Sequence, residues 1–156
     1  MDKNQLRDLI ENTLLEISSL NQKFYSEEAV NLLMGTAAVE SALGKYIRQI
    51  HGPALGIFQM EPATYLDNLK WIYSQGLSFS DKLFDVCNNI RENKPELLMY
   101  NLKVAIVFAR IHYYRKPGAL PESIEGMAQY WKKHYNTHLG KGTEEKFIEY
   151  YKKYVL

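Results

Sequence analysis

One carboxylic acid in this sequence has surroundings suited to proton transfer. Glu40 lies late in a helix predicted over 27–43. Ser26 can cap the start of this helix, and Gly44 is a natural stop. The residues that share a helix face with Glu40 are Leu33, Thr36, Ala37 and Leu43. This small, mostly apolar face would keep water from the carboxyl and raise its pKa, as a general acid near neutral pH requires.

The carboxylates also have plainer explanations. Glu40 can instead lie at the edge of its face and reach water, or pair with Lys45 or Arg48. A glycosidase of the usual type needs a second carboxylate as base or nucleophile. Glu61 precedes Pro62 at a predicted helix start, where capping is the simpler role. The candidates for a second carboxylate are Glu61, Asp67 and Asp85.

Three short elements resemble those of lytic transglycosylases and goose-type lysozymes. Glu40-Ser41 matches the Glu-Ser element of that superfamily. The segment 56–60, Gly-Ile-Phe-Gln-Met, matches its Gly-Leu-Met-Gln element, and Tyr135-Asn136 matches its Tyr-Asn pair. The three occur in the family's order. One departure is that Thr137-His138-Leu139 separates the Tyr-Asn pair from the next glycine.

The resemblance implies a role for each matched residue. Glu40 would be the catalytic acid, and Gln59 would bind the N-acetyl group or a hydroxyl near the scissile bond. Tyr135 would place its hydroxyl against the Glu40 carboxyl. Asn136 would bind sugar or shape the following loop, and Ser41 would contact substrate or tie down the flap. From the residues alone, the Gln59 amide could instead satisfy flap backbone groups, and Tyr135 could pack in the core. Asn136 could equally cap a helix end.

The activity implied by the resemblance is cleavage of the β-1,4 MurNAc-GlcNAc bond of peptidoglycan. In a lytic transglycosylase one glutamate acts as general acid and then as base, and the product is a 1,6-anhydro sugar. A goose-type lysozyme would use water and act as a hydrolase. A third alternative is a non-catalytic peptidoglycan-binding or structural module of a virion or secretion apparatus. The expected partners are peptidoglycan glycan strands, and no cofactor is expected.

Composition and sequence motifs argue against nucleic acid, membrane insertion and a bound metal. The 156 residues suit one domain, 1–156. A formal net charge of +1, from 19 basic and 18 acidic residues, gives no electrostatic footprint for nucleic acid. The longest apolar run, Val104 to Ala109, is far short of the ~20 residues that a membrane span needs. His134 and His138 have metal-pair spacing but lack the glutamate of a His-Glu-x-x-His motif, so no metal is expected.

The N-terminal residues bear on delivery. Residues 1–5 are polar and lack the apolar core of a secretory signal. The sequence therefore predicts a chain made in the cytoplasm and delivered to the cell wall or periplasm by a phage particle, a holin or a secretion machine. Virion or secretion-machine proteins would then be further partners, and a phage-encoded member of the superfamily is our hypothesis.

Apolar spacing and capping signals predict a mostly α-helical, lysozyme-like domain of about seven helices. By analogy with the family, 44–61 would form a small irregular or β-like flap beside the cleft. The apolar middle of the helix expected over 95–114 marks it as central and buried. Gly35, inside a helix, suggests that another backbone passes close by. The helices are expected over 3–20, 27–43, 62–75, 80–91, 95–114, 121–135 and 143–154.

Overall fold

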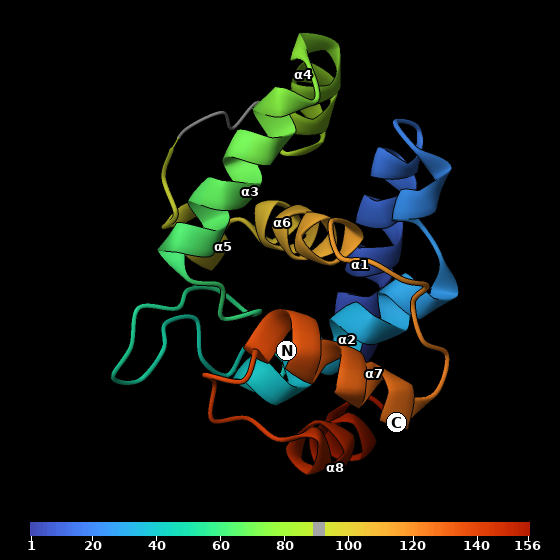
Figure 1. Ribbon diagram of the computed structural model, residues 1–156, viewed down its shortest axis with the longest axis vertical. Coiled ribbons are helices and arrows are strands. Elements are labelled where there is room, and N and C mark those ends of the chain that lie inside the picture. The colour runs from blue at the N-terminus through green and yellow to red at the C-terminus, as the bar shows by residue number, and fades with distance from the viewer. Residues whose placement is uncertain (89–92) are drawn as a thin grey trace.

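The computed structural model describes residues 1–88 and 93–156, which form a mostly α-helical fold, as predicted (Figure 1). The described residues contain eight α-helices, one short 3-10 helix and one π-helical turn, with isolated β-bridges in place of regular strands. No helix among them is long and apolar enough to cross a membrane. The elements are α1 (Lys3–Ser18), η1 (Gln22–Phe24), α2 (Glu27–Ser41), α3 (Pro62–Ser74), α4 (Leu77–Val86), α5 (Leu97–Tyr100), α6 (Leu102–Tyr114), α7 (Ile124–Trp131), η2 (Lys132–Asn136) and α8 (Glu144–Tyr154).

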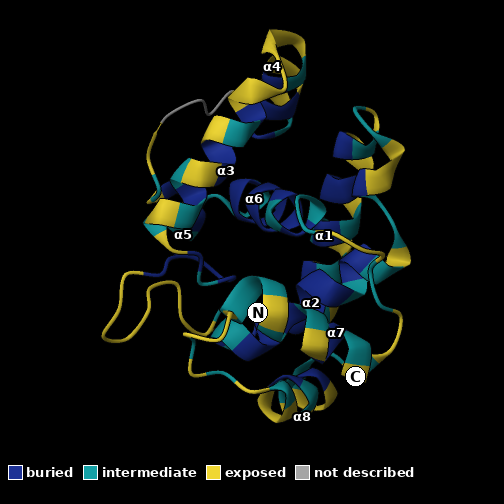
Figure 2. Cartoon of the chain, viewed as in Figure 1, coloured by how far each residue is buried: buried dark blue, intermediate teal, exposed yellow. Residues whose placement is uncertain are grey.

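Helix α6 lies at the centre of the fold, with α1, α2 and α3 packed around it (Figure 1). Its residues from Val104 to Ile111 are all buried, and Figure 2 shows most of the helix in dark blue. The Phe108 ring stacks on Tyr65 of α3 with ring centroids 4.4 Å apart. The prediction of a buried central helix in this part of the chain is therefore confirmed.

The additional helix arises where one long helix was predicted over 95–114. The chain instead forms α5 and α6, separated at Asn101, whose backbone is extended with φ −123°. The Asn101 side chain accepts a hydrogen bond from the Val104 amide at 3.0 Å and so caps α6. A short polar side chain that can cap the backbone offers an alternative to continuing the helix.

Two other helix starts differ from the predicted ones. Helix α4 begins at Leu77 after Gly76, which has φ 101°, and not at Ser80. The prediction that this helix reaches Arg91 falls partly on 89–92, outside the described residues, but α4 itself ends at Val86. Helix α7 begins at Ile124, because the Ser123 side chain caps it at the Gly126 amide.

Helix α8 covers the acid-bearing helix α2. A Cβ atom added to Gly35 would lie 2.4 Å from Phe147 Cζ and 2.9 Å from Tyr151 Cδ2. Both aromatic side chains belong to α8 and are buried. The close approach predicted at Gly35 therefore exists, but it involves two rings and not a backbone. The absence of a side chain at Gly35 lets α8 press its rings against α2.

The segment between α2 and α3 is the predicted flap. Its outer part, 45–53, is exposed and extends away from the helices, whereas 54–58 is buried (Figure 2). Isolated antiparallel bridges join Leu55 to Arg48 and to Met60. Gly56 has φ 77°, and a Cβ there would lie 2.2 Å from the Leu98 carbonyl oxygen. Only glycine suits this turn, which anchors the flap against α5.

Candidate active site

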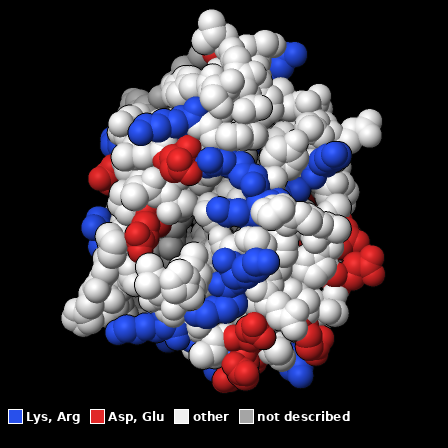
Figure 3. All heavy atoms as spheres, viewed as in Figure 1, with Lys and Arg blue, Asp and Glu red and all other residues white. Residues whose placement is uncertain are grey.

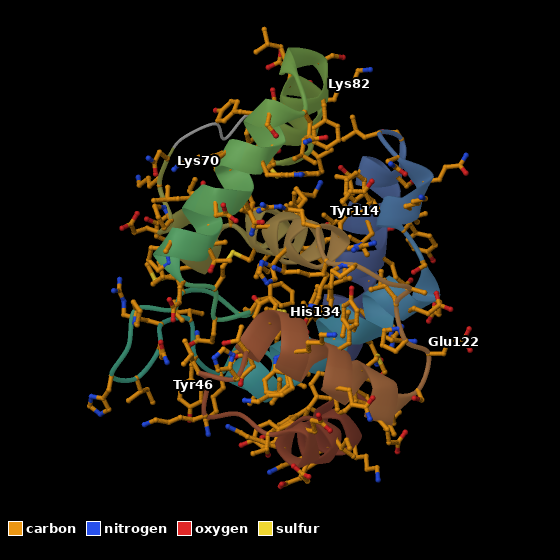
Figure 4. All side chains as sticks on the ribbon, in the orientation of Figure 1. Tyr46, Lys70, Lys82, Tyr114, Glu122 and His134 are labelled. Carbon is orange, nitrogen blue, oxygen red and sulfur yellow. The ribbon has the colours of Figure 1, made fainter. Side chains whose placement is uncertain are left out.

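A cleft of about 900 Å³ opens between the flap, α7–η2 and the loop before α8. Its wall includes Glu40 at the end of α2, together with Gln59, Tyr135 and Asn136. Tyr46, labelled in Figure 4, lines it from the flap. Four of the five site residues expected from the sequence thus line one cleft, although they come from three separate segments of the chain.

The Glu40 carboxyl is largely shielded from solvent at this cleft. The Trp131 indole Nε1 donates a hydrogen bond to Glu40 Oε1 at 2.9 Å. Burial raises the pKa of Glu40 from 4.5 to about 7, against the smaller lowering by the Trp131 hydrogen bond and the positive charge of Lys146. Desolvation outweighs both because they leave most of the hydration of the ionised carboxyl unreplaced. A carboxyl with this pKa is largely protonated just below neutral pH and can donate its proton.

Tyr135 does not contact Glu40 in the expected way. Its hydroxyl donates to the Phe58 carbonyl oxygen at 2.8 Å, while Trp131 supplies the hydrogen bond to Glu40. The flap buries the Phe58 carbonyl, which then needs a donor, and the Tyr135 hydroxyl provides it. The Glu40 charge contributes to raising the pKa of Tyr135, after the larger effect of burial. Tyr135 therefore joins the flap to η2 beside the acid.

Gln59 lies at a strained position on the cleft wall. Its φ of 46° is in the left-handed region that residues with a Cβ adopt rarely. The amide Nε2 donates to the Gly56 carbonyl oxygen at 2.8 Å, so one amide hydrogen satisfies the flap backbone. The rest of the amide belongs to the cleft wall, where it can hydrogen-bond a ligand.

Ser41 lies next to the acid in sequence but does not line the cleft. Its hydroxyl is buried, donates to the Ile57 carbonyl oxygen at 2.6 Å and accepts from the Gly44 amide at 2.9 Å. Of the two roles that the sequence left open, these contacts fit the tie between α2 and the flap.

Asn136 makes contacts with the loop that follows it. Its Oδ1 accepts a hydrogen bond from Lys132 Nζ at 2.7 Å, and the same ammonium group donates to the Gly140 carbonyl oxygen at 3.0 Å. A Cβ on Gly140 would lie 2.5 Å from Asn136 Oδ1, and one on Gly142 would lie 2.4 Å from Trp131 Cη2. Two glycines therefore let the loop close over Asn136 and Trp131.

Of the three candidates for a second carboxylate, one lines the cleft and two do not. Glu61 lines the cleft, is exposed, and makes no side-chain capping bond to α3. Glu61 occupies the N-cap position considered for it, but its side chain makes no capping hydrogen bond. Asp67 instead pairs with Arg115 at 2.8 Å, and neither Asp67 nor Asp85 lines the cleft.

Trp131 and His112 are cleft residues that sequence reasoning missed. Trp131 precedes Tyr135 by four residues on a predicted helix, and this spacing was the available signal. His112 Nε2 donates to the His134 carbonyl oxygen at 2.9 Å. Burial lowers the pKa of His112 to about 4, so it is neutral at pH 7 and does not act as an acid there.

The described residues 1–88 and 93–156 contain no group of three His, Cys, Asp or Glu side chains that could hold a metal ion. No family model, curated protein or solved structure matches this chain. Residues from all three of the sequence elements, Glu40, Gln59 and Tyr135-Asn136, nevertheless line one cleft.

Proposed function

We propose that this chain cleaves the β-1,4 MurNAc-GlcNAc bond of peptidoglycan as a lytic transglycosylase. One observation carries the proposal: the Glu40 carboxyl lines a large cleft, and the pKa of this carboxyl is raised to about 7. The cleft volume of about 900 Å³ suits several sugar rings. Gln59 and Asn136 add amide groups to the same wall.

The proposed mechanism uses Glu40 twice. Protonated Glu40 first donates its proton to the departing glycosidic oxygen, and positive charge develops at the anomeric carbon. The resulting carboxylate then accepts the proton of the sugar's own 6-hydroxyl as that oxygen attacks the anomeric carbon. The attack is intramolecular, so proximity lowers the barrier, and the product is a 1,6-anhydro ring. Ionised Glu40 keeps the Trp131 hydrogen bond, which stabilises the charged form between the two steps.

A hydrolase is the second candidate, and one observation favours it. Glu61 is a second carboxylate on the cleft wall, exposed and without a capping bond. Such a group could activate a water molecule against the anomeric carbon. The products distinguish the two reactions, because an anhydro sugar is one water lighter than a reducing end. Mass spectrometry of muropeptides from purified cell wall, with wild type and Glu61→Gln, therefore decides between them.

The first test of the glycosidase itself is Glu40→Gln, which keeps the shape of the side chain and removes the proton. We expect wall-clearing activity to fall by about 10²–10⁴-fold, the range for a general acid. Glu149→Gln, the same change at an exposed position of α8, is the matched control and should keep full activity. A Glu40→Gln variant that retains more than about a tenth of the activity would contradict the proposed acid.

A further inference from the structure

A second cavity, of about 670 Å³, lies apart from the cleft. It opens between the start of α2, the end of α6 and the segment that follows α6, and it shares no lining residue with the cleft. Figure 4 shows Tyr114 at the end of α6 on this side of the molecule. The cavity is lined by Lys23, Tyr25, Ser26, Glu28, Arg110, Tyr113, Tyr114, Lys116, Gly118, Ala119, Leu120 and Tyr130.

Arg110 forms part of the cavity wall although it is only 3% exposed. Its Nε donates to the Phe24 carbonyl oxygen at 2.8 Å, and its Nη2 donates to the Lys23 carbonyl oxygen at 2.7 Å. These two bonds hold η1 against α6 and give two of the three guanidinium nitrogens a hydrogen-bond partner. The third, Nη1, is buried and has no hydrogen-bond partner among the described residues. An unpaired buried donor costs free energy, and this cost marks Arg110 as a side chain that packing alone leaves unsatisfied.

The charge of Arg110 is also uncompensated. Among the described residues no carboxylate forms an ion pair with it, and the Tyr114 ring lies 5.8 Å from its guanidinium carbon. Burial lowers the pKa of Arg110 to about 10, so the group is still a cation at neutral pH. Buried charges are normally paired, because water no longer solvates them. A structural clamp alone could be built from neutral donors and would not need this charge.

The rim of the cavity strengthens its positive character. Lys23 and Lys116 line it on opposite segments, against one carboxylate, Glu28. Figure 3 shows Lys and Arg side chains gathered across the centre of the viewed face. Four tyrosines supply flat walls between these cations, and tyrosine offers both an aromatic face and a hydroxyl.

We propose that this cavity binds a small organic anion, with a carboxylate or phosphate group against Arg110 and a flat apolar part between the tyrosines. A guanidinium matches both oxyanions through paired N–H donors. The volume is within the usual range for small-molecule sites. This site goes beyond the proposed glycosidase activity and does not depend on it, because the cavity and the cleft share no lining residue.

The test is a titration of the ¹⁵N-labelled full chain, followed by amide chemical shifts. The probes are benzoate and phenyl phosphate, with neutral benzyl alcohol for comparison. We expect saturable shifts within residues 113–120 for at least one anion and at least tenfold weaker binding of benzyl alcohol. The tighter of the two anions identifies the head group. Equal binding of the neutral probe, or no saturable shift with either anion, overturns the proposal.

Variants locate the binding. Arg110 also holds η1, so its loss could unfold the chain, and the lysines at the rim are the better targets. The double variant Lys23→Glu with Lys116→Glu should bind the anion at least tenfold more weakly. Lys152→Glu with Lys153→Glu makes the same charge change on the exposed end of α8 and should bind like wild type. Unchanged affinity in the cavity variant, or equal weakening in the control, overturns the assignment of the site.

Discussion

At the scale of single residues, two opposed effects set the protonation of Glu40. Burial of the carboxyl favours the neutral form, while the Trp131 hydrogen bond and the Lys146 charge favour the ionised form. The pKa of Glu40 is raised, so burial is the larger effect. Trp131 is therefore a positioning residue in the proposed mechanism: it holds Oε1 and moderates the pKa without exchanging a proton with substrate.

Trp131→Phe tests this role through the pH profile of wall cleavage. Loss of the indole donor should raise the Glu40 pKa above about 7, because that hydrogen bond stabilises the carboxylate. The pH at which activity declines on the alkaline side should move upward, with a lower maximum rate. Trp71→Phe, on α3 and outside the cleft, should leave the profile in place. A lower rate with an unmoved profile would reduce Trp131 to a packing role.

At the scale of elements, the cleft depends on two junctions made by α2. Its C-terminal end is tied to the flap through Ser41, and its outer face is pressed against α8 at Gly35. The first junction holds the flap that carries Gln59, which lines the same cleft as the acid. The second brings α8, and with it Lys146, to the same side of Glu40. Each junction can be broken by removing or adding a single small group.

Ser41→Ala breaks the first junction. It would leave the Ile57 carbonyl and the Gly44 amide without the hydroxyl, at a cost of about 1–3 kcal/mol in the free energy of unfolding. Urea denaturation measures the cost, and faster hydrogen exchange at 55–60 would show that the flap is the part that loosens. Ser19→Ala removes an exposed hydroxyl that bonds the Glu16 carbonyl oxygen and should change neither quantity. Uniform destabilisation without faster flap exchange would argue against the tie.

Gly35→Ala overpacks the second junction. The new methyl group would overlap the Phe147 and Tyr151 rings, and such overpacking typically costs about 1–3 kcal/mol. Phe147→Leu removes the ring atom nearest to the added Cβ. We therefore expect the double variant to be more stable than the sum of the two single effects, as a double-mutant cycle by urea denaturation would show. Additive effects would mean that the α2–α8 contact does not set the cost.

At the scale of the whole molecule, the buried acid links stability to pH. Because the Glu40 pKa is raised on folding, the folded chain binds more protons than the unfolded chain between pH 4.5 and about 7. The free energy of unfolding should therefore fall as pH rises through this window. His112 acts oppositely: its pKa is lowered to about 4, so its contribution is lost as pH falls below 6.5. The two groups partly cancel in the wild type.

Comparison with Glu40→Gln isolates the contribution of Glu40 to the pH dependence of stability, because His112 is present in both chains. Wild type and variant should have similar free energies of unfolding near pH 4.5. Above pH 7 the variant should be more stable by about 3 kcal/mol, from the difference between the two pKa values. Urea denaturation at a series of pH values measures the gap. A gap that does not change with pH would contradict the raised pKa.

Much of the fold follows from local signals in the sequence. The Ser26 hydroxyl does cap α2, and the Thr143 side chain caps α8. Pro62 opens α3, and the glycines of 44–56 keep the flap irregular. The chain over 102–111 is apolar on nearly every side, and 104–111 becomes the buried centre. These features depend on neighbouring residues and on the fixed periods of helix and strand, which sequence reasoning captures.

The sequence by itself determined that Glu40 would lie on a small apolar helix face, and the family-like elements singled out Gln59, Tyr135 and Asn136 beside it. Only the tertiary structure decided that the indole of Trp131 holds the acid, that Tyr135 serves the Phe58 carbonyl, and that Arg110 has a nitrogen without a partner. The hydrogen bonds made by Trp131, Tyr135 and Arg110 join residues 77 to 91 positions apart. Side-chain spacing along one helix cannot specify them, because they depend on how separate helices pack and on which backbone groups that packing buries.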